Sequence, residues 1–573
     1  MNDILNVILK MKTFLVTCII MLILHSIGSI MYDTGDDMAM IAIVSGQYAN
    51  IALPDGVFLS HLLSYMLYYF YKAIPYLPWY GMILYLYQLI ACYCFYTIVI
   101  EAFKDNKSRI IVIVSFLALY TYIFYRLNFA STSLFLWFSV LIYLVAMFLL
   151  RPQQNSKNIL LFCGFAMGLS YLLRPSMIAI AIAFSIPLFI VLLLVEKPKK
   201  ILYILIPIIS LAAVNQYVFM TQINNADYEE FLAYNHIRSD FLDTHKSEIN
   251  ERTYEALNHA GWHMEDYKVA KEWWLHDEEI FATEKIDEFL EINTHTLISM
   301  HDITKIFKSP FIILLCGSML IYRFKTTSTK ISNEKKRLIH SILMKSLCII
   351  ILLSVGLATI RFPMRVEIPI FILILCYVIL LKLTKTSDTN NAYTSKKNML
   401  SYFFVLAIIV TFMITHYKLE REVLKNYSFQ KYTIESYNSV TELQGADVTF
   451  VPLKIKSINN TVSPLYEYKS IPHYNFIPAG WMIRSPIYYQ CLKRLGISSG
   501  HEFMSYIIDN DKVVLSYYWS ENNELLDDFI RFINSHYAPL KKKLVLEVVM
   551  DKRRVSVGEQ DGWIFYKIKA QDL

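Results

Sequence analysis

Long apolar segments alternate with short polar ones along most of the chain. The segments 13–31 and 178–195 are nearly continuous apolar runs, and each can cross a hydrocarbon core of about 30 Å as a helix. Buried helices of a soluble protein are the alternative, but such runs recur too often for that. The first run follows Lys10 and Lys12. It is longer than the apolar part of a signal peptide and lacks a small-residue cleavage pattern, so we expect a retained helix.

We expect about eleven transmembrane helices. The expected spans are 13–31, 79–100, 110–125, 132–150, 159–173, 176–195, 201–221, 306–322, 341–360, 367–382 and 399–417. Three polar regions are too long to be simple connections, and they lie at 32–78, 222–305 and 418–573.

The last polar region combines strand-like runs, such as KKLVLEVVM and GWIFYKI, with the helical pattern ELLDDFIRFINSHY. This mixture predicts a small soluble α/β domain. The predicted fold class is therefore an α-helical polytopic membrane protein with a small extracytoplasmic α/β C-terminal domain. Residues 1–417 form the transmembrane domain, which includes the loops 32–78 and 222–305, and residues 418–573 form the soluble domain.

Lys and Arg are unevenly distributed between alternate loops. The loops that are cytoplasmic if the N-terminus is inside hold 19 of them, and the short loops on the other side hold 5. Cytoplasmic loops are enriched in Lys and Arg. We therefore expect a multi-pass protein of a bacterial cell membrane, with a cytoplasmic N-terminus. The net charge of +6 could suggest a nucleic-acid partner. Because the basic residues lie between the apolar segments, they report the topology instead, and we expect no nucleic-acid partner.

The composition supports the same class. Of the 573 residues, 55% are hydrophobic and 18% are charged, below the roughly 25% charged residues of soluble proteins. Of the eight cysteines, only Cys491 lies in a polar region, and their spacing matches neither a disulfide framework nor a metal site. The sequence has no phosphate-binding glycine loop of the form G-x-x-x-x-G-K and no zinc-protease motif of the form H-E-x-x-H.

The first polar loop begins with a cluster of acids, Asp33, Asp36 and Asp37, directly after the first span. A carboxylate that faces lipid costs roughly 2.5–3.5 kcal/mol, so these side chains should face water, a partner or a substrate. One alternative is an ordinary interfacial turn. Another is a cap for a helix that starts near Met38.

Four of the five basic residues on the opposite side from the cytoplasm are arginines, namely Arg126, Arg174, Arg361 and Arg365. A guanidinium makes paired hydrogen bonds to phosphate and stays charged at any relevant pH. These positions therefore suggest an anionic ligand. The alternatives are contact with lipid headgroups and pairing with the acids of the first loop.

Two further polar clusters are candidates for substrate binding. Asn235 and Arg238 are three residues apart on a predicted helix and share a face. Trp481 and Arg484 stand in the aromatic segment NFIPAGWMIRSPIYYQ. Aromatic rings with an arginine suit stacking on a sugar, but they suit a membrane-interface anchor equally well.

With the acidic pair Asp36-Asp37 and the amphipathic segment after it, the chain resembles the membrane-embedded GT-C glycosyltransferases, which include protein O-mannosyltransferases and aminoarabinose transferases. In that superfamily an acidic pair follows the first transmembrane helix, and interfacial helices come next. The remainder is similar to uncharacterised bacterial multispanning proteins with the stretches DD…SG.Y, YN..R, R.P.RV and GW…SP.Y.

The resemblance implies an enzyme that moves a sugar from a polyprenyl-phosphate donor to an extracytoplasmic glycan, lipid or protein. It implies that Asp36, the first acid of the pair, acts as general base or orients the acceptor. From their positions directly after the first span, we expect Asp37 to support it and Asp33 to be the fallback. The resemblance also implies that the outside arginines bind the donor phosphate. No cofactor is firmly predicted. A divalent metal could replace the arginines, although the sequence supplies no dedicated metal cage.

Three other functions stay open. A transporter or flippase for lipid-linked sugars would place charges deep within its spans and often contains inverted repeats. A polysaccharide polymerase or ligase also acts on polyprenyl-linked sugars, but usually depends on one large outer loop. A non-enzymatic assembly factor would use the C-terminal region for binding.

Overall fold

The computed structural model describes most of the chain. It covers residues 2–46, 51–151, 157–195, 198–223, 226–244, 249–293, 309–323, 331–360, 363–385, 396–453, 464–465, 475–519, 524–556 and 559–572.

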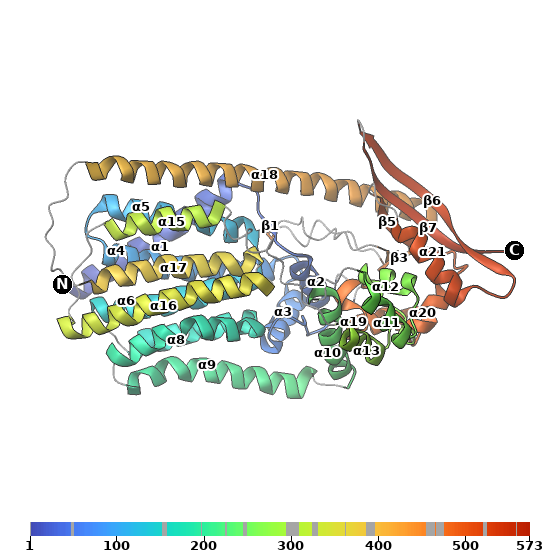
Figure 1. Cartoon of the computed structure of the whole chain (residues 1–573), viewed down its shortest axis with the longest axis horizontal. Coiled ribbons are helices and arrows are strands. Elements are labelled where there is room, and N and C mark those ends of the chain that lie inside the picture. Colours follow the sequence, from blue (N-terminus) through green and yellow to red (C-terminus); the bar gives the residue numbers. More distant parts are fainter. Residues whose placement is uncertain are drawn as a thin grey trace.

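In the described part of the chain, eleven helices run side by side in an elongated bundle (Figure 1). They are α1 (Asn2–Ile27), α4 (Trp79–Ala102), α5 (Asn106–Tyr125), α6 (Phe129–Leu150), α7 (Lys157–Leu173), α8 (Ile178–Val195), α9 (Pro198–Val218), α15 (Ser309–Arg323), α16 (Asn333–Ile360), α17 (Met364–Thr384) and α18 (Lys396–Gln444). Each expected span falls largely on one of them.

Seven of these helices are long and apolar enough to cross a membrane within the described residues: α4, α5, α6, α8 with the preceding turn, α9, α16 and α17. The expected count of about eleven spans is therefore not confirmed. The apolar stretches of α1 and α7 are shorter, at Met11–Ile27 and Lys157–Leu173, and α15 has 15 residues. The membrane-protein class rests on the seven long helices.

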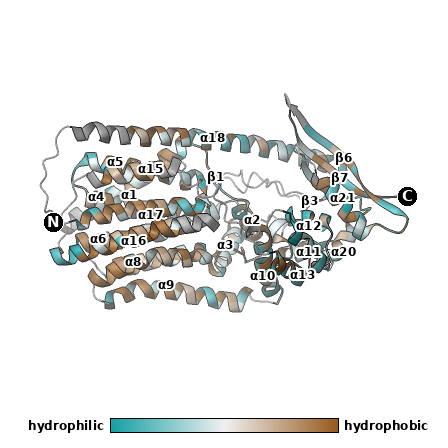
Figure 2. Cartoon of the chain, in the orientation of Figure 1, coloured by the Kyte–Doolittle hydropathy of each residue, from teal (hydrophilic) through white to brown (hydrophobic). Residues whose placement is uncertain are grey.

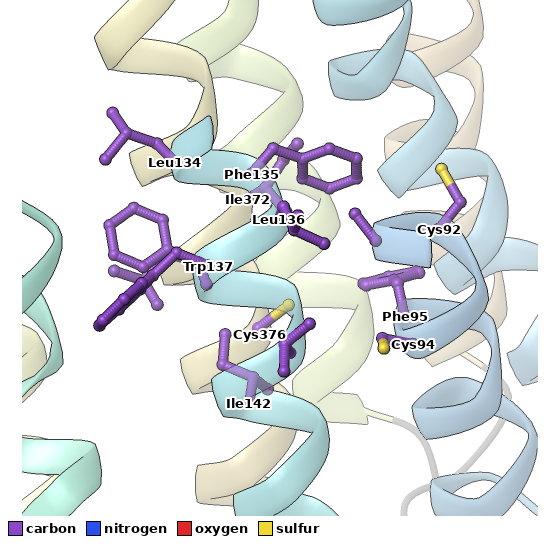
Figure 3. Packing of buried hydrophobic residues seen from close by; sticks show 14 of the residues in the cluster. Cys92, Cys94, Phe95, Leu134, Phe135, Leu136, Trp137, Ile142, Ile372 and Cys376 are labelled. Atoms are coloured by element: carbon purple, nitrogen blue, oxygen red, sulfur yellow. The ribbon is translucent and has the colours of Figure 1, made fainter. Parts of the chain in front are cut away.

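The buried centre of the bundle is built on α6 and α17. In the apolar stretch of each, 94% of the residues are buried, against 17% in α9 at the periphery. Figure 3 shows Phe135 and Trp137 of α6 among Phe95 of α4 and Cys376 of α17. Since α6 and α17 are apolar on all sides, the other helices can pack around them.

Close backbone contact joins α7 to α9. A Cβ added at Gly164 of α7 would lie 2.2 Å from the carbonyl oxygen of Ile204 on α9. Only glycine allows this approach, as is common where helices pack in membranes.

A second, more polar region covers one end of the bundle (Figures 1 and 2). Its helices are α10 (Ala226–Ser239), α11 (Glu251–Ala260), α12 (Met264–Lys271), α13 (Thr283–Ile292), α19 (Pro486–Arg494), α20 (Gly500–Tyr506) and α21 (Glu524–Tyr537). We call these helices and the sheet described next the polar lobe. Its apolar core draws on residues from both 228–289 and 451–568, so the two long polar regions of the sequence fold together.

The sheet of the polar lobe has five strands in the order β4-β3-β5-β7-β6. They are β3 (Thr449–Pro452), β4 (Asn475–Phe476), β5 (Val513–Trp519), β6 (Lys542–Ser556) and β7 (Glu559–Asp572). β3 pairs in parallel with β4 and β5, whereas β7 pairs antiparallel with β5 and β6. The expected α/β character of this region is thus present near the C-terminus.

α18 joins the two regions. It runs 49 residues without interruption, and the predicted domain boundary after residue 417 lies inside it. Beyond that boundary, Tyr437 packs on Phe450 and Phe565, with ring centroids 4.8 and 5.1 Å apart. Thr433 accepts a hydrogen bond from Nε1 of Trp563 at 2.9 Å.

Candidate functional site

The acidic pair begins helix α2 (Gly35–Ser45), which lies between the bundle and the polar lobe (Figure 1). Carboxylates in the first turn of a helix are stabilised by the positive end of its dipole. Residues Asp37 to Val44 are all buried. Successive side chains on a helix point about 100° apart, so Asp36 and Asp37 face different surroundings.

Asp37 is fully buried and accepts four hydrogen bonds. Its donors are the hydroxyls of Tyr80 (2.7 Å) and Thr34 (3.1 Å), Nδ2 of Asn128 (2.9 Å) and the backbone N–H of Phe129 (3.2 Å). Burial raises the pKa of Asp37 to about 7, and the hydrogen bond from Tyr80 opposes that rise. Asp37 therefore ties α2 to the first turns of α4 and α6.

Asp36 stays partly exposed, with 29% of its side chain accessible. Its Oδ1 accepts a hydrogen bond from Nε1 of Trp481 at 3.1 Å, and its Oδ2 lies 3.8 Å from Nη1 of Arg365, in the first turn of α17. Three distant segments thus meet at one accessible carboxylate, at the junction of the bundle and the polar lobe.

Arg174 belongs to the same group. It lies between α7 and the short turn Pro175–Met177, and the charges of Asp36, Arg365 and Asp37 all act on its guanidinium. Burial lowers the pKa of Arg174 to about 10, while the charge of Asp36 opposes the shift. The group therefore remains a cation at neutral pH.

The rings of Phe58 and Phe129 support this guanidinium. Its central carbon lies 4.7 Å from each ring centroid, a cation–π distance. Nη1 of Arg174 also donates to the carbonyl oxygen of Phe58 at 3.4 Å.

Asp33 and Arg126 form a second ion pair beside α18, and the charge of Arg365 also acts on Asp33. Nη1 of Arg126 lies 3.4 Å from Oδ1 of Asp33, and Nη2 contacts Glu422 of α18. A short parallel pairing brings them together, with Met31 opposite Arg126. Burial raises the pKa of Asp33, and the charge of Arg126 opposes the rise. Acids on both sides balance the charge of Arg126.

The remaining predicted residues are placed elsewhere. Nη2 of Arg238 donates to Oδ1 of Asn235 at 2.8 Å, and the guanidinium lies 4.8 Å from the ring of Trp273. Arg484 is buried in the polar lobe. Its Nη2 donates to the carbonyl oxygens of Leu275, Asp277 and Phe281. Arg361 lies outside the described residues.

Of the predicted residues, the structure brings Asp36, Asp37, Arg174, Arg365 and Trp481 to one junction. The sequence reasoning missed Tyr80, Asn128, Phe58 and Phe129. Asn128 carried a signal, because an asparagine directly before an apolar helix is a typical N-cap, and its Oδ1 indeed accepts from the N–H of Ala130.

Within the described ranges, no group of three or more His, Cys, Asp and Glu side chains is arranged to hold a metal ion. Comparison of the chain with models of protein families, with curated proteins and with solved structures gave no match.

Proposed function

We propose that the protein is a membrane glycosyltransferase that moves a sugar from a polyprenyl-phosphate donor to an acceptor outside the cytoplasm. One observation carries this proposal. An accessible carboxylate, Asp36, lies beside two guanidinium groups, Arg365 and Arg174, at the junction of an apolar bundle and a polar lobe. A donor with a lipid tail and a phosphate headgroup needs an apolar and a cationic surface side by side.

The arrangement suits displacement at an anomeric carbon. The oxygen of an acceptor hydroxyl forms a bond to that carbon, while the bond from the carbon to the phosphate oxygen breaks. Asp36 takes the hydroxyl proton as general base and releases it to water. The polyprenyl phosphate leaves with the electron pair, and Arg365 and Arg174 stabilise its developing negative charge. The hydrogen bond from Trp481 holds one carboxylate oxygen in place.

The residues have distinct roles in this proposal. Asp36 is the base and Asp37 is the buried support that fixes α2. Asp33 is already paired with Arg126, which makes it the matched acid for comparison. The acceptor is a glycan, lipid or protein, and the protein resides in a bacterial cell membrane.

The test is transfer from a polyprenyl-phosphate-linked sugar by the purified full chain in lipid. Replacing Asp36 with Asn keeps the shape and removes the base, so the rate should fall about 10²- to 10⁴-fold. Asp33→Asn serves as the control and should retain most of the activity. Loss with Asp33→Asn and near-normal turnover with Asp36→Asn would move the base to Asp33. If neither these acids nor Asp37 affects transfer, the proposal is wrong.

A further inference from the structure

We infer that Phe58 is a positioning residue that holds Arg174 in place to bind the donor phosphate, an inference that rests on the proposed function. The ring of Phe58 touches both halves of the candidate site. On one side it lies 4.7 Å from the guanidinium carbon of Arg174, and on the other its centroid lies 4.6 Å from that of Trp481. Trp481 in turn holds Asp36.

Phe58 and Phe129 form an aromatic cradle for the guanidinium. Their rings are nearly parallel, at 15°, with centroids 6.3 Å apart. Contact with the rings restrains the guanidinium and, apart from the hydrogen bond from Nη1 to the carbonyl oxygen of Phe58, does not use its N–H groups. The Nε atom of Arg174 is buried and has no hydrogen-bond partner among the described residues, which leaves a donor available for an anion.

A strained turn presents Phe58. The preceding residue, Val57, has a φ of 61°, a left-handed conformation that is costly for a β-branched side chain. Its N–H donates to Oδ1 of Asp55 at 3.0 Å, and the N–H of Gly56 donates to the hydroxyl of Ser64 at 3.1 Å. Such strain tends to accumulate where function requires a particular geometry. Here the turn places the ring of Phe58 against Arg174 and Trp481.

The consequence is a fixed spacing between the base and the cation. Since one ring packs on Arg174 and on the partner of Asp36, movement of the phosphate-binding group relative to the base is restricted. Positioning of this kind affects binding of the anionic headgroup and leaves binding of the lipid tail unchanged.

The test measures binding of farnesyl phosphate, and of farnesol as its neutral counterpart, to the purified full chain in detergent. Phe58→Leu keeps an apolar side chain but removes the ring face, and should weaken farnesyl phosphate binding about tenfold with farnesol unaffected. Phe58→Tyr should restore binding. Phe70→Leu is the matched control, because Phe70 is also half-buried but packs on Trp79 instead.

A double variant separates the positioning role from the phosphate site. Arg174→Gln should itself weaken farnesyl phosphate binding, and adding Phe58→Leu should cause no further loss. An equal loss on the Arg174→Gln background would overturn the positioning role and leave the proposed function standing. If Arg174→Gln binds farnesyl phosphate as well as the wild type does, or if the wild type shows no phosphate-dependent binding, both the donor site and this inference fail.

Val57→Gly provides a second variant that keeps the ring. Glycine adopts the left-handed conformation without strain, which offsets the loss of the apolar contacts of Val57 with the core of the polar lobe, so this variant should still fold. Because the turn becomes more mobile, farnesyl phosphate binding should weaken. Unchanged or tighter binding would contradict the role of the turn.

Discussion

Asp36 and Asp37 are adjacent in the chain, but their side chains meet opposite surroundings. Asp36 reaches the accessible junction, where it meets Trp481 and Arg365. Asp37 turns inward and accepts hydrogen bonds from Thr34, the residue before α2, from α4 and from the start of α6. Removal of Asp36 should therefore affect transfer, whereas removal of Asp37 should affect stability.

Asp37 should make the stability of the protein depend on pH. Burial raises its pKa from 3.8 to about 7, so between these values the folded protein holds a proton that the unfolded chain has released. The contribution of Asp37 to folding therefore decreases as the pH rises from about 4 to 7 and is constant above. In thermal unfolding of the full chain in detergent, the wild type should lose stability relative to Asp37→Asn across this interval.

The exposed acid Asp227 of α10 provides the control for this measurement. Asp227→Asn should leave the pH dependence of the melting temperature unchanged, since that side chain is exposed. If the difference in melting temperature between the wild type and Asp37→Asn stays constant from pH 4 to 8, the assignment to Asp37 is contradicted.

At the scale of the elements, Asn128 links the start of α6 to α2. Its Oδ1 accepts from the N–H groups of Ala130 and Ser131, as a helix N-cap does, while its Nδ2 donates to Asp37. One side chain thus caps the central helix of the bundle and anchors the helix that carries the proposed base.

Asn128→Ala should destabilise the protein by more than the roughly 1 kcal/mol of a typical lost N-cap, because a buried acceptor on Asp37 also loses its donor. The matched control is Asp105→Ala, which removes the N-cap of α5 at a surface position. The melting temperature and the transfer activity should both decrease for Asn128→Ala. For Asp105→Ala only a small loss of stability is expected, and equal effects would argue against the link to Asp37.

The helices were predictable because their signal is local, whereas the contacts of the site are not. Each expected span falls largely on a bundle helix, although only seven of these helices are long and apolar enough to cross a membrane within the described residues. By contrast, 445 positions separate Trp481 from Asp36, and 91 separate Asn128 from Asp37. No periodicity connects such pairs. Arg484 shows the same limit: its sequence suggested a ligand, but folding places three carbonyl oxygens around its guanidinium.

At the scale of the whole molecule, the described parts of the long polar regions gather at one end of the bundle, and the helix ends that the basic loops connect lie toward the other (Figure 1). The excess of Lys and Arg in those loops predicts that their end faces the cytoplasm.

Reporter fusions test this orientation. A reporter joined after Leu573 should behave as extracytoplasmic, and one joined before Met1 as cytoplasmic. Alkaline phosphatase, which is active only outside the cytoplasm, and a fluorescent protein that matures inside provide opposite readouts at each end. A cytoplasmic C-terminus would exclude the predicted arrangement.

α18 runs without interruption from the bundle to the sheet of the polar lobe, so its length determines the distance between them. Glu420 accepts a hydrogen bond from Ser29 and Tyr427 donates one to Ile30, directly after α1. Further along α18, Thr433 and Tyr437 are hydrogen-bonded to Trp563 and Ser516 of the sheet. Counted from the predicted end of its span at residue 417, the helix continues for roughly 27 residues, or about 40 Å. In the predicted orientation, this stretch holds the sheet at a constant distance from the lipid surface. Under the proposed function, the acceptor enters between the lipid surface and the sheet, so the length of one helix limits the size of the acceptor.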